Sequence, residues 1–249
     1  MNGAIYDLFA GTGGVSAACR RFGFASRIFE LLNSVKHDLC KIGVRLMIRR
    51  DIASGRVISI MLGPPSASFS EAHRIARALR SRRFPWGRPG LSPEQLAVLA
   101  DGNRCARATL AIMRDAMKYC IPFILEQPVG STMRWLPELR RLMKQEPERF
   151  TEYIIDQCAF GAPYRKRTWL LCFRIEDPGM LECVRPCHSR GGVCASTGLP
   201  HVQLVGSRRT SAAAAYPRLL CDALGKALCS RGQSSLAAWY CDVGRAQGS

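Results

Sequence analysis

The feature that most constrains the fold is an alternation of short apolar segments with amphipathic ones over residues 4–175. The apolar segments have the length of strands, and most are followed by a turn and then by apolar side chains at helical spacing. This alternation predicts an α/β fold with a doubly wound, mostly parallel sheet, which would bind ligands at the carboxyl ends of its strands. The last two strands are expected to pair antiparallel at one edge. Strands are predicted at residues 5–9, 27–32, 57–62, 121–125, 150–155 and 168–175, and helices at 15–22, 40–53, 93–120 and 137–144.

A glycine-rich turn follows the first predicted strand and opens the first helix. It reads Asp-Leu-Phe-Ala-Gly-Thr-Gly-Gly over residues 7–14. Glycines here permit a tight turn and let a ligand approach the backbone and the helix N-terminus. The same turn would also fit a dinucleotide-binding fold or a simple connection. Glu30 ends the second strand, where an acid can bind ribose hydroxyls or lie in solvent.

Three further elements lie beside predicted strands. Gly-Pro-Pro-Ser-Ala-Ser-Phe-Ser occupies residues 63–70, directly after an apolar strand. Leu-Glu-Gln-Pro follows another apolar strand at residues 125–128, and Phe-Gly-Ala-Pro-Tyr-Arg-Lys-Arg-Thr precedes a late strand at residues 160–168. Any one of these elements could arise by chance, but all of them in this order with the glycine-rich turn make a specific constellation.

Together these elements resemble the motifs of the S-adenosylmethionine-dependent cytosine-5 DNA methyltransferases, over residues 4–175. The resemblance implies a Rossmann-like class I methyltransferase core and methyl transfer to C5 of cytosine in DNA, with a carboxyl group at Glu126 that stabilises charge at N3 of the base. Asp38 would face the adenine amino group or cap the next helix, and its short distance from Glu30 suggests that one strand is missing. The cofactor-binding residues implied are Phe9, Gly11, Thr12, Gly13, Gly14, Glu30, Asp38 and Pro64. The catalytic positions implied are Ser66, Glu126, Arg165, Lys166, Arg167 and Thr168.

Ser66 stands where this family has its nucleophilic cysteine. A thiol supplies some thiolate at neutral pH, whereas a serine hydroxyl needs an adjacent general base. The chain could be a degenerate enzyme, carry a deliberate cysteine-to-serine substitution, or bind without turnover. The alternative function is therefore a catalytically inactive pseudo-methyltransferase that binds nucleic acid, and an RNA cytosine-5 or amino methyltransferase ranks below it.

The formal net charge of +17 indicates a polyanionic partner, because neutralised phosphates release condensed counterions. Arginines and aromatic residues lie directly after the Ser66 loop, a mixture that suits phosphates and unstacked bases, although a basic surface insertion has the same composition. Nucleic acid, with DNA first, is the predicted partner, and no membrane is expected. The predicted nucleic-acid-binding residues are Arg74, Arg77, Arg80, Arg82, Arg83, Trp86 and Arg88.

The predicted organisation is a catalytic core at 1–175, a small recognition-like segment at 176–210, a returning helix at 211–231 and a tail at 232–249. The twelve cysteines show no secreted-domain rhythm, which favours reduced thiols and an intracellular protein, nuclear if eukaryotic. Four residues of the recognition-like segment could hold zinc, or its cysteines could be free and buried. These four are Cys183, Cys187, Cys194 and His201.

Overall fold

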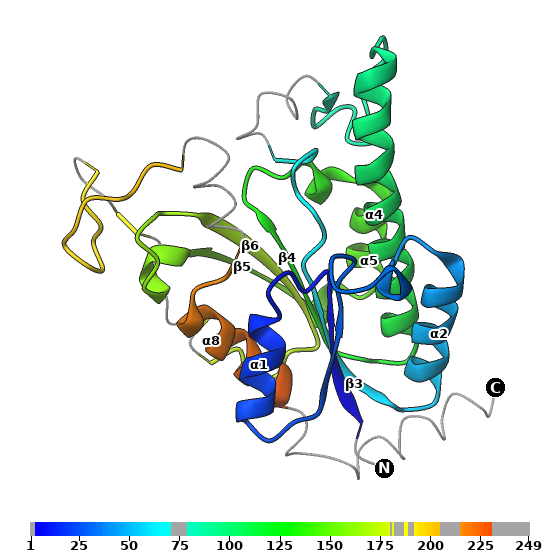
Figure 1. Cartoon of the computed structure of the whole chain (residues 1–249), viewed down its shortest axis with the longest axis horizontal. Coiled ribbons are helices and arrows are strands. Elements are labelled where there is room, and N and C mark those ends of the chain that lie inside the picture. The colour runs from blue at the N-terminus through cyan, green and yellow to red at the C-terminus, as the bar shows by residue number, and fades with distance from the viewer. Residues whose placement is uncertain are drawn as a thin grey trace.

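The computed structural model describes residues 3–70, 79–179, 181, 187–188, 192–204 and 215–230. Within this part of the chain, a six-stranded sheet has the order β2-β1-β3-β4-β6-β5 (Figure 1). The first four strands run parallel, whereas β6 is antiparallel to both of its neighbours, β4 and β5. The predicted sheet type and its late antiparallel pair are confirmed. The strands are β1 (Ala4–Leu8), β2 (Ser26–Phe29), β3 (Val57–Leu62), β4 (Phe123–Pro128), β5 (Phe150–Asp156) and β6 (Arg167–Phe173).

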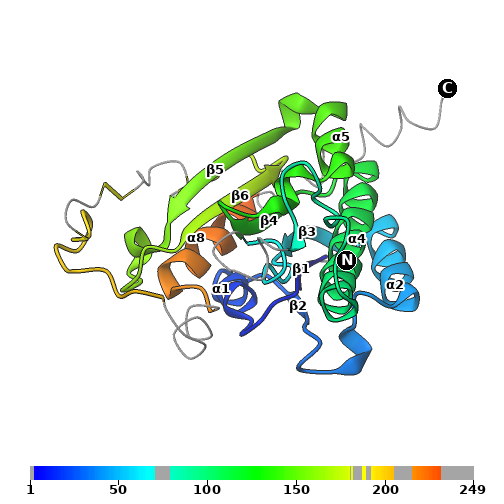
Figure 2. The ribbon, with the colours of Figure 1, turned by 90° about the horizontal axis from the view of Figure 1, so that it is seen from above.

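Helices cover both faces of the sheet, as the two views in Figures 1 and 2 show. Helices α2, α4 and α5 lie on one face, and α1 and α8 lie on the other. The helices are α1 (Gly14–Arg21), α2 (Ile42–Ala53), α4 (Pro93–Lys118), α5 (Pro137–Gln145) and α8 (Arg218–Cys229), with 3-10 turns η1 (Val35–His37), η2 (Thr132–Trp135), η3 (Pro147–Arg149) and η4 (Gln157–Phe160). None of the described helices combines the length and the apolar character that a membrane span requires.

Alternate side chains of the central strands divide between two hydrophobic clusters. Ile5 and Met61 pack in the cluster that includes α1 and α8, while Tyr6 and Ile60 pack in the cluster that includes α2, α4 and α5. This period of two follows from the pleat of a strand, and burial on both faces explains why the strands read as nearly continuous apolar runs.

Helix α8 is the returning helix that was predicted at residues 211–231, and it packs closely on α1. A Cβ atom at Gly14 would lie 2.6 Å from the Cys221 sulfur, and one at Gly225 would lie 2.9 Å from the Ala18 Cβ. The Ser59 hydroxyl donates a hydrogen bond to the Leu228 carbonyl at 2.9 Å, which ties β3 to the same helix. Glycine at 14 is therefore required for helix packing.

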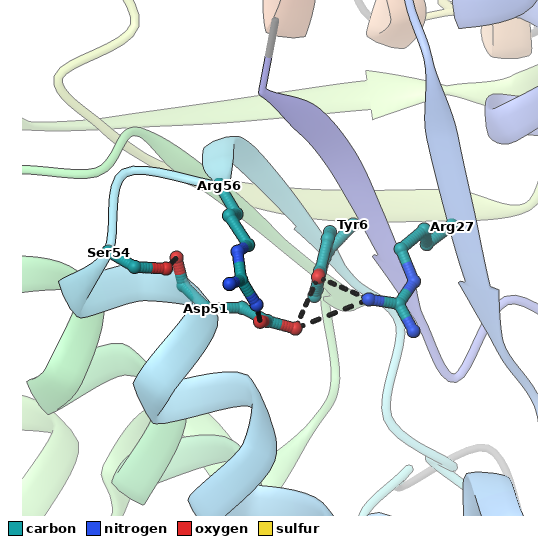
Figure 3. Close-up of polar contacts among 5 residues, drawn as sticks. All are labelled: Tyr6, Arg27, Asp51, Ser54 and Arg56. Atoms are coloured by element: carbon teal, nitrogen blue, oxygen red, sulfur yellow. Dashed lines mark hydrogen bonds and ion pairs between the residues drawn. The ribbon is translucent and has the colours of Figure 1, made fainter. Parts of the chain in front are cut away.

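A polar network around the buried Asp51 of α2 joins this helix to β1 and β2 (Figure 3). The Tyr6 hydroxyl donates to Asp51 at 2.6 Å, and Arg27 and Arg56 donate to the same carboxylate at 3.2 and 3.1 Å. Burial, with the hydrogen bond to Asp51, raises the pKa of Tyr6 to about 12. Among the described residues no strand pairs beyond β2, in agreement with the suggestion that one strand is missing.

Candidate active site

The glycine-rich turn after β1 is fastened to the end of β2. The Phe9 amide donates to the Phe29 carbonyl at 2.9 Å, and the Gly11 amide donates to a Glu30 carboxylate oxygen at 2.8 Å. The other Glu30 oxygen accepts from the Leu32 amide at 3.2 Å. Phe9 and Gly11 both have positive φ, so the turn is held in a conformation that favours glycine. The predicted neighbours Phe9, Gly11 and Glu30 therefore meet at the carboxyl ends of adjacent parallel strands.

The glycines of this turn have different surroundings. A Cβ at Gly11 would meet nothing within 4 Å, so only this position opens to free space. Gly13 is buried, with a φ of 70° and the Ile28 side chain 2.8 Å from where its Cβ would lie. A side chain at Gly14 would meet Cys221 of α8, so helix packing explains the need for glycine here. Thr12 lies exposed between Gly11 and Gly13.

Asp7 is a site residue that was not among the predicted positions, although it begins the glycine-rich motif. It is buried at the end of β1 and accepts a hydrogen bond from the Ser16 amide in the first turn of α1 at 3.0 Å. Burial raises its pKa to about 6, against the opposing effect of the hydrogen bond from Ser16. The carboxyl group thus holds the turn against the helix N-terminus.

Asp38 acts locally in the described structure. Its carboxylate accepts a hydrogen bond from the Cys40 amide at 2.9 Å, and its carbonyl accepts one from the Lys41 amide at 3.0 Å. These bonds shape the turn that leads into α2, but the N-cap of α2 is Lys41 and no side chain caps the helix, so the expected capping role of Asp38 is not observed.

The Gly-Pro-Pro-Ser loop begins at the end of β3 and is bonded to the end of β4. The Gln127 side chain donates to the Pro64 carbonyl at 2.7 Å. The Ser66 carbonyl accepts from the amides of Phe69 and Ser70 at 2.9 and 2.8 Å, which curls the loop into one turn. No described residue hydrogen-bonds to the Ser66 hydroxyl, so the described part of the chain supplies no base to activate it. Gln127 is a further site residue that was not predicted, and it fixes Pro64 in place.

Glu126 is buried beside this loop, with 6% of its surface exposed. The Tyr216 hydroxyl donates to one carboxylate oxygen at 2.9 Å, while Oε1 has no hydrogen-bond partner among the described residues. A Cβ at Gly63 would lie 3.1 Å from that Tyr216 hydroxyl, so Gly63, Glu126 and Tyr216 converge. Burial raises the pKa of Glu126, against the nearby charge of Lys166 and the bond from Tyr216. Tyr216 was not predicted as a site residue. It belongs to the segment that precedes α8.

The segment at residues 165–168 divides between two places. The Lys166 Nζ lies 5.8 Å from the centre of the Tyr216 ring, and its charge opposes the rise in the pKa of Glu126. Arg165 and Arg167 form ion pairs with the buried Asp156 at 3.2 and 3.9 Å. Thr168 is buried and accepts a hydrogen bond from the Gln157 side chain at 3.2 Å. Some of these residues are expected to line the pocket, and among the described contacts both arginines pair with Asp156 and neither pairs with Glu126.

The arginine-rich segment after the Ser66 loop contains one buried member, Arg80, with 1% exposure. Its guanidinium donates to the Ser68 carbonyl at 2.9 Å, to the Pro85 carbonyl at 2.7 Å and to Asn103 Oδ1 at 2.8 Å. It also lies 3.7 Å from the centre of the Phe69 ring. The prediction that Arg80 contacts nucleic acid is wrong, because its donors are used to fasten residues 79–88 to the Ser66 loop.

Trp86 also has an internal role. Its indole N–H donates to Glu138 at 3.0 Å, and Arg107 lies 4.7 Å from the centre of its ring. It packs against the core cluster that contains α4, so it is not free to stack on a base as predicted. Arg82, Arg83 and Arg88 lie exposed, whereas Arg74 and Arg77 lie outside the described residues.

Arg82 lies on a basic and aromatic surface next to the loop. Its guanidinium is 3.9 Å from the centre of the Trp135 ring, and Arg134 and Arg140 lie within 5.5 Å of the same ring. A cation over an aromatic face keeps its charge available to solvent.

Three of the four predicted zinc ligands also converge. Cys187, Cys194 and His201 come together with Cys158 of η4, and Cys183 lies outside the described residues. Cys158 was not predicted, because it lies 25 positions before Cys183, the first of the predicted ligands.

The sheet order, the antiparallel β6 and the loops at the ends of β1 and β3 define the Rossmann-like methyltransferase fold. No protein-family model and no curated protein matches the chain. Among solved structures it is similar to the Entamoeba histolytica methyltransferase EhMeth, with 10% identity over 82% of this chain and 57% of that chain and a TM-score of 0.43. It is also similar to a triple mutant of Spodoptera frugiperda DNMT2, with 16% identity over 69% of this chain and 50% of that chain and a TM-score of 0.42.

The chain thus spans about half the length of these solved proteins. Likeness at this level is weak. The resemblance to the cytosine-5 methyltransferases therefore rests on the motifs and the site geometry of this chain.

Proposed function

We propose that this chain binds S-adenosylmethionine and an unstacked cytosine of DNA in a cytosine-5 methyltransferase site, with turnover limited by Ser66. The observation that carries the proposal is Glu126. A buried carboxyl oxygen without a hydrogen-bond partner lowers the stability of the folded chain. A bound ligand would supply the missing partner. In this proposal the cytosine base lies next to Glu126, between the Gly63 loop and Lys166.

In its protonated form, the Glu126 carboxyl group can donate a hydrogen bond to N3 of cytosine. Burial raises its pKa, so the carboxyl group retains a proton more readily than an exposed glutamate. A protonated oxygen can donate to N3 and stabilise the charge that develops when a nucleophile adds to C6. Tyr216 holds the other oxygen and thereby fixes the direction of the donor.

The residues of the β1–β2 loops fit an adenosine-containing cofactor. Gly11 is open to a ligand, and Glu30 is fixed by two amides, with lone pairs left for ribose hydroxyls. S-adenosylmethionine would supply the methyl group from its sulfonium centre. The protein would hold it so that the methyl group faces the base beside Glu126.

Nucleic acid is the proposed partner because of the charge and the exposed arginines. Arg82, Arg83 and Arg88 flank the Ser66 loop, to which Arg80 anchors their segment. Binding should therefore weaken steeply with salt, and an Arg82→Ala change should reduce the slope of log K against log[salt] by about one, uniformly across sequences. DNA unwound or mismatched at the target base should bind best, since the base must leave its stack.

The test is to restore the thiol. Ser66→Cys should produce transfer of a tritiated methyl group from S-adenosylmethionine to cytosine in DNA, and it should form a covalent complex with 5-fluorocytosine DNA. Ser70→Cys places a thiol four residues away on the same loop and should do neither. Robust methylation by the serine form would contradict the role given to Ser66, and transfer to RNA alone would contradict the choice of DNA.

A second candidate is a pseudo-methyltransferase that binds both ligands without reaction. It is favoured by one observation: no described residue hydrogen-bonds to the Ser66 hydroxyl. If the Ser66→Cys variant binds S-adenosylmethionine and DNA but transfers no methyl group, this second function holds.

A further inference from the structure

We propose that Cys158, Cys187, Cys194 and His201 bind one structural zinc ion. Their ligand atoms all lie within 4.8 Å of one another. The Cys187 and Cys194 sulfurs are 3.9 Å apart, and the Cys187 sulfur is 3.8 Å from His201 Nε2. A tetrahedral zinc ion with ordinary bond lengths would place two sulfurs about 3.8 Å apart and a sulfur and a nitrogen about 3.5 Å apart. The described positions thus need only small shifts to close around an ion.

The chemistry of the donors selects zinc. Three thiols and one imidazole form a closed Cys₃His set, which is typical of structural zinc sites and leaves no open position for catalysis. A disulfide would need sulfurs about 2 Å apart, so the Cys187–Cys194 separation excludes that bond in the described arrangement.

The surroundings of the cluster support a metal. The Ala195 amide donates to the Cys187 sulfur at 3.3 Å, the kind of contact that stabilises a metal-bound thiolate. The Cys194 carbonyl accepts from the Gly198 amide at 2.9 Å, and the Cys194 amide donates to the Leu199 carbonyl at 2.8 Å, which closes a tight turn behind one ligand.

The described residues around the four ligands bury little apolar surface. The three cysteines form a small buried cluster of their own, while Val193, Leu199 and Val202 are 40%, 66% and 43% exposed. A segment that buries so little apolar surface cannot offset the entropy of ordering its backbone. A zinc ion would supply that free energy, as it does in small metal-dependent domains.

The ion would also join this segment to the catalytic core. Cys158 belongs to η4, directly after β5, whereas the other ligands come from residues 187–201. The Cys187 amide donates to Asp156 at 2.7 Å, and the Val202 amide donates to the Pro163 carbonyl at 2.8 Å. Asp156 in turn pairs with Arg165, one residue from Lys166. Zinc would therefore fix the segment against the loop that carries Lys166, a role that stands whether or not the proposed methyltransferase function is correct.

The experiment is metal analysis of the full chain after passage through a chelating resin. We expect one zinc per chain by mass spectrometry of the metal, and a cobalt-substituted form with the absorption of tetrahedral thiolate coordination. Cys158→Ser and Cys194→Ser should lose the zinc. Cys172→Ser is the matched control, because Cys172 is equally buried but lies in β6 outside the cluster, and this variant should keep the ion.

Cys183→Ser distinguishes the set found in the structure from the set predicted from the sequence, and it should also keep full zinc. Absence of zinc from the unmodified chain, or full zinc in Cys158→Ser, would overturn the proposal. The cobalt spectrum of the unmodified chain provides a reading that does not depend on whether any variant folds.

Discussion

The two halves of the candidate site differ in how their polar groups are satisfied. At the end of β1 and β2, both oxygens of Glu30 accept backbone amides and Asp7 accepts another. At the end of β3 and β4, Glu126 has one oxygen bonded to Tyr216 and one without a described partner. The first half is preorganised by its own hydrogen bonds, and we propose that a ligand supplies the missing partner in the second half. A buried atom without a partner is thus a stronger indication of binding than a loop motif whose groups are already paired.

The largest expected effect lies in the second half. In a Ser66→Cys background, Glu126→Ala should lower methyl transfer by roughly 10²–10⁴-fold, the size typical of one acid–base group. Glu126→Gln should retain more activity, since its amide can still donate to N3, and should lose the decline in rate that the glutamate form shows when its proton is removed at higher pH. Rates measured against pH for the three forms provide the check. Glu148→Gln, an exposed acid in η3, should behave as the parent, and equal rates for all forms would remove Glu126 from the site.

The next effect lies in the first half and concerns Asp7. Its pKa is raised to about 6 from an ordinary value of 3.8, so the folded chain binds this proton more tightly than the unfolded chain. Stability should therefore be greatest below pH 4 for this group and should fall by about 3 kcal/mol as the pH rises to about 6. Asp7→Asn should remove that fall in urea unfolding curves, whereas the exposed Asp101→Asn should not. Parallel pH profiles for the parent and Asp7→Asn would contradict the shift.

Substitution of Arg80 tests whether this residue anchors residues 79–88 to the Ser66 loop in the second half of the site. Arg80→Met keeps most of the side-chain volume but removes the bonds to Ser68, Pro85 and Asn103, so the free energy of unfolding should fall by about 2 kcal/mol. Arg83→Met removes an exposed arginine from the same segment and should change stability by less than about 0.5 kcal/mol. Equal effects of the two changes, measured by urea unfolding, would mean that Arg80 is not an anchor.

The smallest effect is expected at Glu30. Glu30→Gln keeps one acceptor for the turn but loses the negative charge, so the Kd for S-adenosylmethionine should rise about tenfold, or about 1.4 kcal/mol. Titration calorimetry with Glu148→Gln as the control provides the measurement. An unchanged Kd would show that the paired half of the site does not bind the ribose, and would sharpen the contrast with Glu126.

The sequence alone was sufficient for the sheet, its late antiparallel pair and the order of the motifs. Apolar periodicity and turn residues act over a few positions, so strands, helices and the glycine-rich turn can be predicted without knowledge of long-range contacts. For the same reason Glu30 was correctly placed at the end of β2, whereas Glu126 lies within β4, which continues to Pro128 by pairing with β6. The local conformation of each motif follows from the residues of that motif.

Only the tertiary structure decided which side chains meet. Arg80 is buried because α4 and the Ser66 loop close over it, although the nearby Arg82 and Arg83 lie in solvent. Of the residues at 165–168, Arg165 and Arg167 pair with Asp156, whereas Lys166 lies by the Tyr216 ring. Cys158 joins the cysteines of a distant segment because β5 ends beside them. Such partnerships depend on the packing of elements far apart in the chain, and no local pattern in the sequence records them.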